Sequence, residues 1–116
     1  MANGDEIGRR DGVHMGNKLL DAEATNVSGP WVSVTPYIKN VSVQVKGAFS
    51  WDGTVTIYGT NNDDEAAASG GVAIGSTEAG GVDSLIQLAG FTYRKIRAEQ
   101  TLRTAGTVTA RFEGVR

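Results

Sequence analysis

The chain has 116 residues, with 11 basic and 13 acidic side chains, a formal net charge of −2 and no cysteine. This length suits one domain with one core, and the near-balance of charge argues against sequence-independent nucleic-acid binding, which needs an excess of lysine and arginine. Disulfides and thiolate metal sites are excluded, no apolar run reaches the ~18 residues of a membrane span, and the polar N-terminus lacks the apolar region of a secretory signal.

Residues 1–29 differ in pattern from the rest of the chain. Gly4, Gly8, Gly12 and Gly16 interrupt any helix, and the charged residues follow no period. A segment of this composition is disordered by itself and becomes ordered only against another surface. We therefore predict an extended N-terminal arm over residues 1–29 and a folded domain over residues 30–116.

From residue 30 onward, apolar and polar residues alternate, which is typical of half-buried strands. The clearest run carries Val41, Val43 and Val45. A second run, over residues 54–59, follows the dipeptide Asp52-Gly53, which is a strong signal for a tight hairpin turn. The pattern predicts a β-hairpin over residues ~43–59, with its odd-numbered side chains pointing inward.

Further short segments continue this pattern to the end of the chain. Residues 72–74 are short enough for an edge strand, and residues 82–88 and 107–113 predict two more strands. Residues 91–98 start with apolar side chains at odd positions and switch to even ones at Ile96, which predicts a β-bulge. No segment supplies the helical crossover that parallel strands need. We predict an all-β fold, a β-sandwich or jelly-roll-like domain of about seven to eight antiparallel strands.

The predicted core consists of the apolar residues that face inward in this arrangement. They are Trp31 or Val32, Val41, Val43, Val45, Phe49, Val55, Ile57, Leu85, Leu88, Tyr93, Ile96, Val108, Ala110 and Phe112.

The sequence offers few groups for catalysis. His14 is the single histidine, and the predicted arm that carries it cannot orient it for acid–base chemistry. An imidazole metal site would need a second histidine. The carboxylates of Asp63, Asp64 and Glu65 lack the spacing of an EF-hand loop, so a polar hairpin tip explains them, with calcium binding as the alternative. We expect no enzymatic activity and no cofactor or metal.

Aromatic side chains leave a second interpretation open. Rings in strands usually belong to a core or an interface. They can also form a platform on which a sugar stacks, as in β-sandwich carbohydrate-binding modules. The residues concerned are Trp31, Tyr37, Trp51, Tyr58 and Tyr93.

Strand and turn segments between residues 19 and 114 follow a recognisable order. They are Leu19-Leu20-Asp21-Ala22, Ser28-Gly29-Pro30-Trp31-Val32-Ser33-Val34, Val41-Ser42-Val43-Gln44-Val45-Lys46-Gly47-Ala48-Phe49, Gly53-Thr54-Val55-Thr56-Ile57-Tyr58-Gly59-Thr60-Asn61-Asn62-Asp63, Tyr93-Arg94-Lys95-Ile96-Arg97-Ala98 and Gly106-Thr107-Val108-Thr109-Ala110-Arg111-Phe112-Glu113-Gly114. Together they resemble the small virion structural proteins of tailed bacteriophages. The loop after Tyr58 is longer here than in that pattern.

The resemblance implies a β-sandwich protein of the virion, made in the host cytoplasm. The form we favour is a head decoration (cement) protein on the outer capsid surface, which binds the major capsid protein and copies of itself, often as a homotrimer. We expect the arm to make these contacts with the capsid or with neighbouring subunits. The residues concerned are Ile7, His14, Met15, Leu19, Leu20 and Trp31. The alternatives are a tail or fibre-attachment (adaptor) module and a carbohydrate-binding module that takes glycans on its exposed loops.

Overall fold

The structure is a computed structural model, and it describes residues 14–34, 38–77 and 80–115. These residues form eight β-strands and no helix. The strands are β1 (His14–Glu23), β2 (Val32–Ser33), β3 (Asn40–Ala48), β4 (Thr54–Thr60), β5 (Val72–Ser76), β6 (Ser84–Ala89), β7 (Lys95–Thr101) and β8 (Thr107–Val115). Within the described ranges, no helix is long and apolar enough to cross a membrane.

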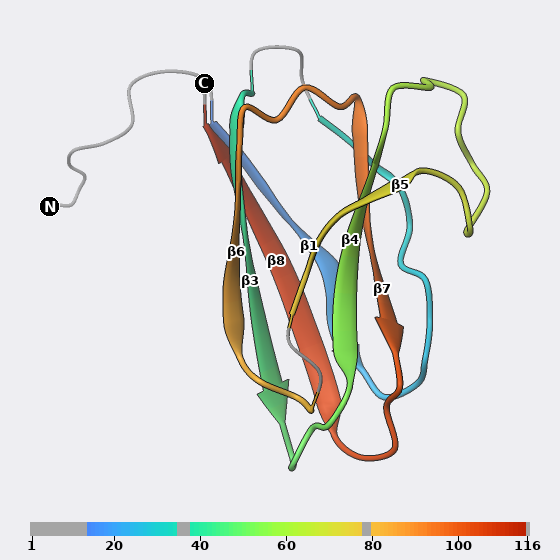
Figure 1. Cartoon of the computed structure of the whole chain (residues 1–116), viewed down its shortest axis with the longest axis vertical. Coiled ribbons are helices and arrows are strands. Elements are labelled where there is room, and N and C mark those ends of the chain that lie inside the picture. The colour runs from blue at the N-terminus through green and yellow to red at the C-terminus, as the bar shows by residue number, and fades with distance from the viewer. Residues whose placement is uncertain (1–13, 35–37, 78–79, 116) are drawn as a thin grey trace, which may run out of the picture.

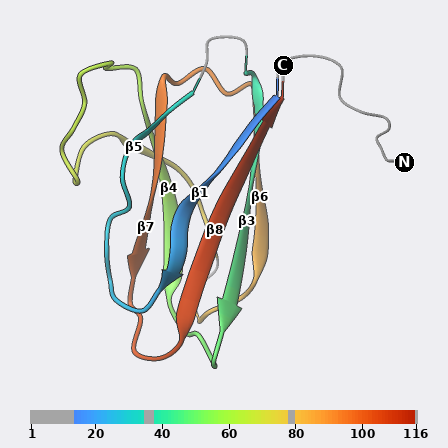
Figure 2. The same ribbon diagram turned by 180° about the vertical axis from the view of Figure 1, so that it is seen from behind.

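The strands form two four-stranded sheets, with the orders β1-β8-β3-β6 and β2-β7-β4-β5, and every pair of neighbours is antiparallel. The sheets lie against each other as the two layers of a sandwich (Figure 1), and Figure 2 shows the same two layers from behind. The prediction of an all-β sandwich is confirmed. The predicted strands over residues 72–74, 82–88 and 107–113 correspond to β5, β6 and β8.

The core lies between the sheets and follows the predicted alternation over most strands. In β8, for example, Val108, Ala110 and Phe112 are buried while their neighbours are more exposed. The other predicted residues that are fully buried are Val41, Val43, Val45, Val55, Ile57 and Ile96, whereas Val32, Leu88 and Tyr93 are partly buried against them. Two predictions are wrong, because Phe49 and Leu85 are exposed.

The predicted arm is wrong for residues 14–29, which belong to the sandwich. Strand β1 pairs with β8 from His14↔Val115 to Glu23↔Val108, and the Gly29 amide donates to the carbonyl oxygen of Ala98 at 2.8 Å. The glycines that exclude a helix do not exclude a strand. The register also shifts twice, between Lys18 and Glu23. Because of these irregularities, the sequence of β1 does not show the alternation of apolar and polar residues that a regular strand would have. Residues 1–13 lie outside the described residues.

The predicted hairpin over residues 43–59 is also wrong, because β3 and β4 lie in different sheets. Positive φ values occur at Phe49 and Ser50 rather than at Asp52 and Gly53, so the chain turns earlier and crosses to the other layer. Inward-facing side chains alternate in the same way in a hairpin and in two facing strands. The alternation therefore identified most buried residues of this segment, though not Phe49, without identifying the strand pairing.

The predicted bulge near Ile96 is not present. Strand β7 pairs with β4 without a register shift from Thr54↔Thr101 to Thr60↔Lys95. The change of phase arises because Phe91 and Tyr93 belong to the segment before β7. Phe91 is nevertheless buried, so this irregular segment closes one end of the core.

Candidate protein-interaction site

Three connecting segments meet at one end of the sandwich, opposite the end where β1 begins and β8 finishes (Figure 1). We call residues 48–53, 80–83 and 102–106 the loop end. The Asp52 carboxylate joins the first segment to the third, because its Oδ1 accepts hydrogen bonds from the amides of Thr104 at 2.8 Å and Ala105 at 2.9 Å, and its Oδ2 accepts one from the Thr104 hydroxyl. The Gly81 amide donates to the carbonyl oxygen of Gly53 at 3.0 Å. The three segments thus form one connected unit.

The charge of Asp52 is stabilised by the same contacts. The hydrogen bond from the Thr104 hydroxyl, followed by those from the Thr104 and Ala105 amides, lowers the pKa of the Asp52 carboxyl from 3.8 to about 2. Donors that bind the ionised form favour it over the protonated form. Asp52 is therefore ionised at all but strongly acidic pH, and the loop end keeps this connection.

Buried polar contacts fix the loop end to the body of the domain. Trp51 is buried, and its Nε1 donates to Oε1 of the buried Gln100 at 2.5 Å. Nε2 of Gln100 donates in turn to the carbonyl oxygen of Thr25 at 2.6 Å. Gly106, with φ +80°, lies so close that a Cβ there would be 2.4 Å from Cα of Trp51. The backbone that carries the loop end is therefore packed tightly and cannot shift freely.

Three large apolar side chains of the loop end are exposed to solvent, and Phe49 and Leu102 are more exposed than the third, Val82. Phe49 is 84% exposed and Leu102 is 71% exposed. Both have left-handed backbone conformations, with φ of 58° and 60°, which cost a side chain with a Cβ roughly 1–2 kcal/mol. Strain of this kind persists where the surroundings enforce it, often at functional sites. Because neither side chain contributes to the core, the loop end is a candidate surface for binding another protein.

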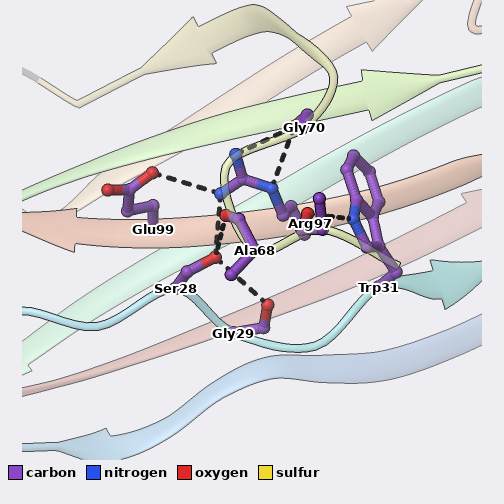
Figure 3. A network of polar contacts seen from close by, with 8 residues as sticks. Ser28, Gly29, Trp31, Ala68, Gly70, Arg97 and Glu99 are labelled. Atoms are coloured by element: carbon purple, nitrogen blue, oxygen red, sulfur yellow. Dashed lines mark hydrogen bonds and ion pairs between the residues drawn. The ribbon is translucent and has the colours of Figure 1, made fainter. Parts of the chain in front are cut away.

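A polar cluster centred on Arg97 lies on the outward face of the β2-β7-β4-β5 sheet (Figure 3). The Arg97 side chain is only 1% exposed. Its Nη1 donates to Oε1 of Glu99 at 3.1 Å and to Oγ of Ser28 at 2.9 Å, while Nε and Nη2 both donate to the carbonyl oxygen of Gly70. The guanidinium carbon lies 4.0 Å from the ring centroid of Tyr58 and 5.3 Å from that of Trp31.

This Arg97 cluster holds the long loop between β4 and β5, residues 61–71, against the sheet. Trp31 Nε1 donates to the carbonyl oxygen of Ala67 at 2.9 Å, and Ser28 Oγ donates to that of Ala68 at 2.8 Å. Asp63 of this loop pairs with Arg94, and no group of three or more potential metal ligands is found within the described part of the chain. The cluster has a structural role, which is to order an otherwise polar loop.

The predicted contact residues therefore have several different locations. Leu19 and Leu20 are buried in the core of their own domain, so the prediction that they contact a neighbour is wrong. The backbones of His14 and Met15 pair with Val115 and Gly114 in the sheet. Ile7 lies outside the described residues.

Within the described ranges, the aromatic residues named above do not combine into one open platform. Trp51 is buried, and the rings of Trp31 and Tyr58 contact Arg97. Tyr37 lies outside the described residues. Sequence reasoning missed Phe49 and Leu102 as exposed contacts and Arg97 as a buried one. No local signal distinguishes these residues, since an apolar residue in a strand pattern predicts a core position and an arginine predicts a surface one.

Comparisons with known proteins show the fold. No protein-family model and no curated protein sequence matches the chain. Among solved structures, the crystal structure of the SPBc2 prophage-derived protein YomS is similar, with a TM-score of 0.70 and 14% sequence identity over 96% of this chain and 100% of that chain. The likeness therefore covers nearly all of both chains.

Proposed function

We propose that the chain is a structural protein of a tailed-phage particle and that it acts as a head decoration (cement) protein, which binds the major capsid protein on the outer shell. Two lines of support are independent of each other. One is the resemblance of its strand and turn segments to virion structural proteins. The other is a fold shared, over nearly the full length, with a prophage-derived protein.

The observation that carries the binding role is the exposure of Phe49 and Leu102 on strained, tightly supported backbone. A surface that must bind a rigid shell gains from such preorganisation, because fewer side-chain and backbone rotations are lost on association. Decoration of a shell also needs only modest affinity at each contact, since neighbouring copies bind side by side. The proposed role is therefore binding, without catalysis and without a cofactor.

The first thirteen residues, with Ile7, remain a predicted second contact. The chain continues from them into β1 at His14, which lies at the end of the sandwich away from the loop end (Figure 1). Under this proposal the loop end is the principal contact. Removal of residues 1–13 would then weaken particle binding less than loss of the two apolar side chains does.

The test uses phage particles produced by the strain that encodes this chain. Particles are purified, and the number of copies of the chain on each is measured by quantitative mass spectrometry, with antibody labelling in the electron microscope to locate them. Hundreds of copies on the head support decoration. A few copies, or about a dozen, at the tail support the alternative of a tail or fibre-attachment module. Absence from particles overturns both.

A matched pair of variants tests the loop end itself. The double variant Phe49→Asn and Leu102→Asn removes the two most exposed apolar side chains of the loop end, and asparagine tolerates the left-handed backbone at both positions. We expect the number of copies per particle to fall at least tenfold, with unchanged thermal unfolding. The control is Val72→Asn, which removes an exposed valine of β5 that pairs with Gly59, toward the end of β4 that lies away from the loop end. An unchanged number of copies for the double variant would refute this binding surface.

A further inference from the structure

The four edge strands of the sandwich differ in how they are protected against pairing with another strand. An edge strand presents unpaired backbone amides and carbonyls, and proteins usually block it with charges, proline, bulges or short length. Strand β1 carries Lys18, Asp21 and Glu23 and two register shifts. Strand β2 has two residues, and β5 has five with a register shift against β4. Each of these three edges is therefore protected.

Strand β6 has none of these protections. Its sequence, Ser84-Leu85-Ile86-Gln87-Leu88-Ala89, contains no charge and no proline, and its register with β3 is unbroken from Asn40↔Ala89 to Val45↔Ser84. Among the described strands it pairs with β3 alone. Figures 1 and 2 both show it along the lateral margin of the sandwich. Leu85 on its outward face is 59% exposed.

We infer that two copies of this chain pair through β6, antiparallel about a two-fold axis, so that their β1-β8-β3-β6 sheets join into one continuous sheet. This inference does not depend on the proposed function. A two-fold contact requires a surface that is complementary to itself. An uncharged strand satisfies this condition, because no like charges face each other across the axis.

The alternation of side chains selects the register. Two residues that face each other across antiparallel strands point to the same side of the sheet. In a two-fold pair of identical strands, one residue therefore lies at the axis and faces the same residue of the second copy. If Gln87 faces Gln87 of the second copy, Ile86 faces Leu88 and Leu85 faces Ala89. Every apolar residue then meets another apolar residue. A register centred on Ile86 instead places Leu88 against Ser84.

Charges at the ends of β6 fit the same arrangement. Asp83, immediately before the strand, and Lys39, next to the other end, are both exposed. A two-fold axis brings the Lys39 end of one copy to the Asp83 end of the other. Opposite charges at the rim favour this orientation over a parallel one, although they add little affinity. With six residues per strand the contact is small, so we expect a reversible dimer.

The experiment measures the mass of the purified full-length chain by sedimentation velocity, over a roughly hundredfold range of concentration. The wild type is expected to change from monomer to dimer. Gln87→Lys and Gln87→Glu each place like charges across the axis and should shift the transition to at least tenfold higher concentration. An equal mixture of the two should restore the dimer at the wild-type concentration, because the charges are then opposite.

The control is Gln44→Lys, which adds the same charge on the same outward face at the position of β3 that pairs with Leu85. It should leave the transition unchanged, and equal denaturation midpoints for all variants would show that they fold. A wild type that stays monomeric, a trimer that Gln87→Lys leaves intact, or a mixture that does not dimerise would each overturn the inference.

Discussion

The Arg97 cluster yields a quantitative prediction for the variant Arg97→Met, which keeps a long apolar side chain but removes the charge and every donor. The carbonyl oxygen of Gly70, in a partly buried residue, then loses both of its Arg97 donors, and an acceptor left unsatisfied there costs up to about 1–3 kcal/mol. Loss of the contacts with the Tyr58 and Trp31 rings adds about 1 kcal/mol. Glu99 adds little, because its side chain remains 31% exposed and water can solvate it.

We therefore expect Arg97→Met to lower the free energy of unfolding by about 3 kcal/mol, a large fraction of the ~5–15 kcal/mol typical of a domain. Urea denaturation measures this loss, and cleavage after Glu65 by a glutamate-specific protease should accelerate because the loop over residues 61–71 is released. The control is Arg94→Met, whose partner Asp63 is largely exposed, so its cost should stay below about 1 kcal/mol. A loss for Arg97→Met no larger than that of the control would refute the reasoning.

Two further predictions concern the loop end. Gly106→Ala and its control Gly90→Ala both place a Cβ on a left-handed backbone, with φ of 80° and 69°, but only the Cβ at position 106 would meet other atoms, at 2.4 Å from Cα of Trp51. In urea denaturation, Gly106→Ala should therefore lower the free energy of unfolding by about 2 kcal/mol more than Gly90→Ala does. Asp52→Asn tests the lowered pKa. The stabilisation from Asp52 is present above its unfolded pKa of 3.8 and is lost as the pH falls through about 2. Between pH 3.8 and pH 2, the thermal midpoint of the wild type should therefore fall more steeply than that of Asp52→Asn. Equal pH dependence of the two midpoints would contradict the lowered pKa.

The alternation of apolar and polar residues predicted which side chains face the core between the two sheets better than it predicted which strands pair. Val41, Val43, Val45, Val55 and Ile57 are all buried as expected, because burial of an alternate residue is a local property of a strand. Pairing is not local. Strand β3 lies between β8 and β6, which are far from it in sequence, and nothing near residue 45 specifies those neighbours.

The residues that sequence analysis placed wrongly share a dependence on distant parts of the chain. Arg97 is buried because residues 61–71 fold over it, and Leu19 and Leu20 can both face the core because β1 is irregular where it pairs with β8. Phe49 is exposed because the chain turns at that residue. The resemblance to virion proteins agreed with the observed fold, but it could not indicate which side chains remain outside the core.

Together, the loop end and the edge of β6 imply how copies would be arranged on a particle. Within one copy the loop end lies at one end of the strands, and β6 runs along the side (Figure 1). Antiparallel pairing through β6 therefore directs the loop ends of two copies away from each other. If both proposals hold, a dimer has two apolar contacts that face outward in opposite directions, so it can connect two neighbouring capsid sites but cannot bind one site twice. Such bridging strengthens a shell without tight individual contacts, because binding at one end raises the effective concentration at the other.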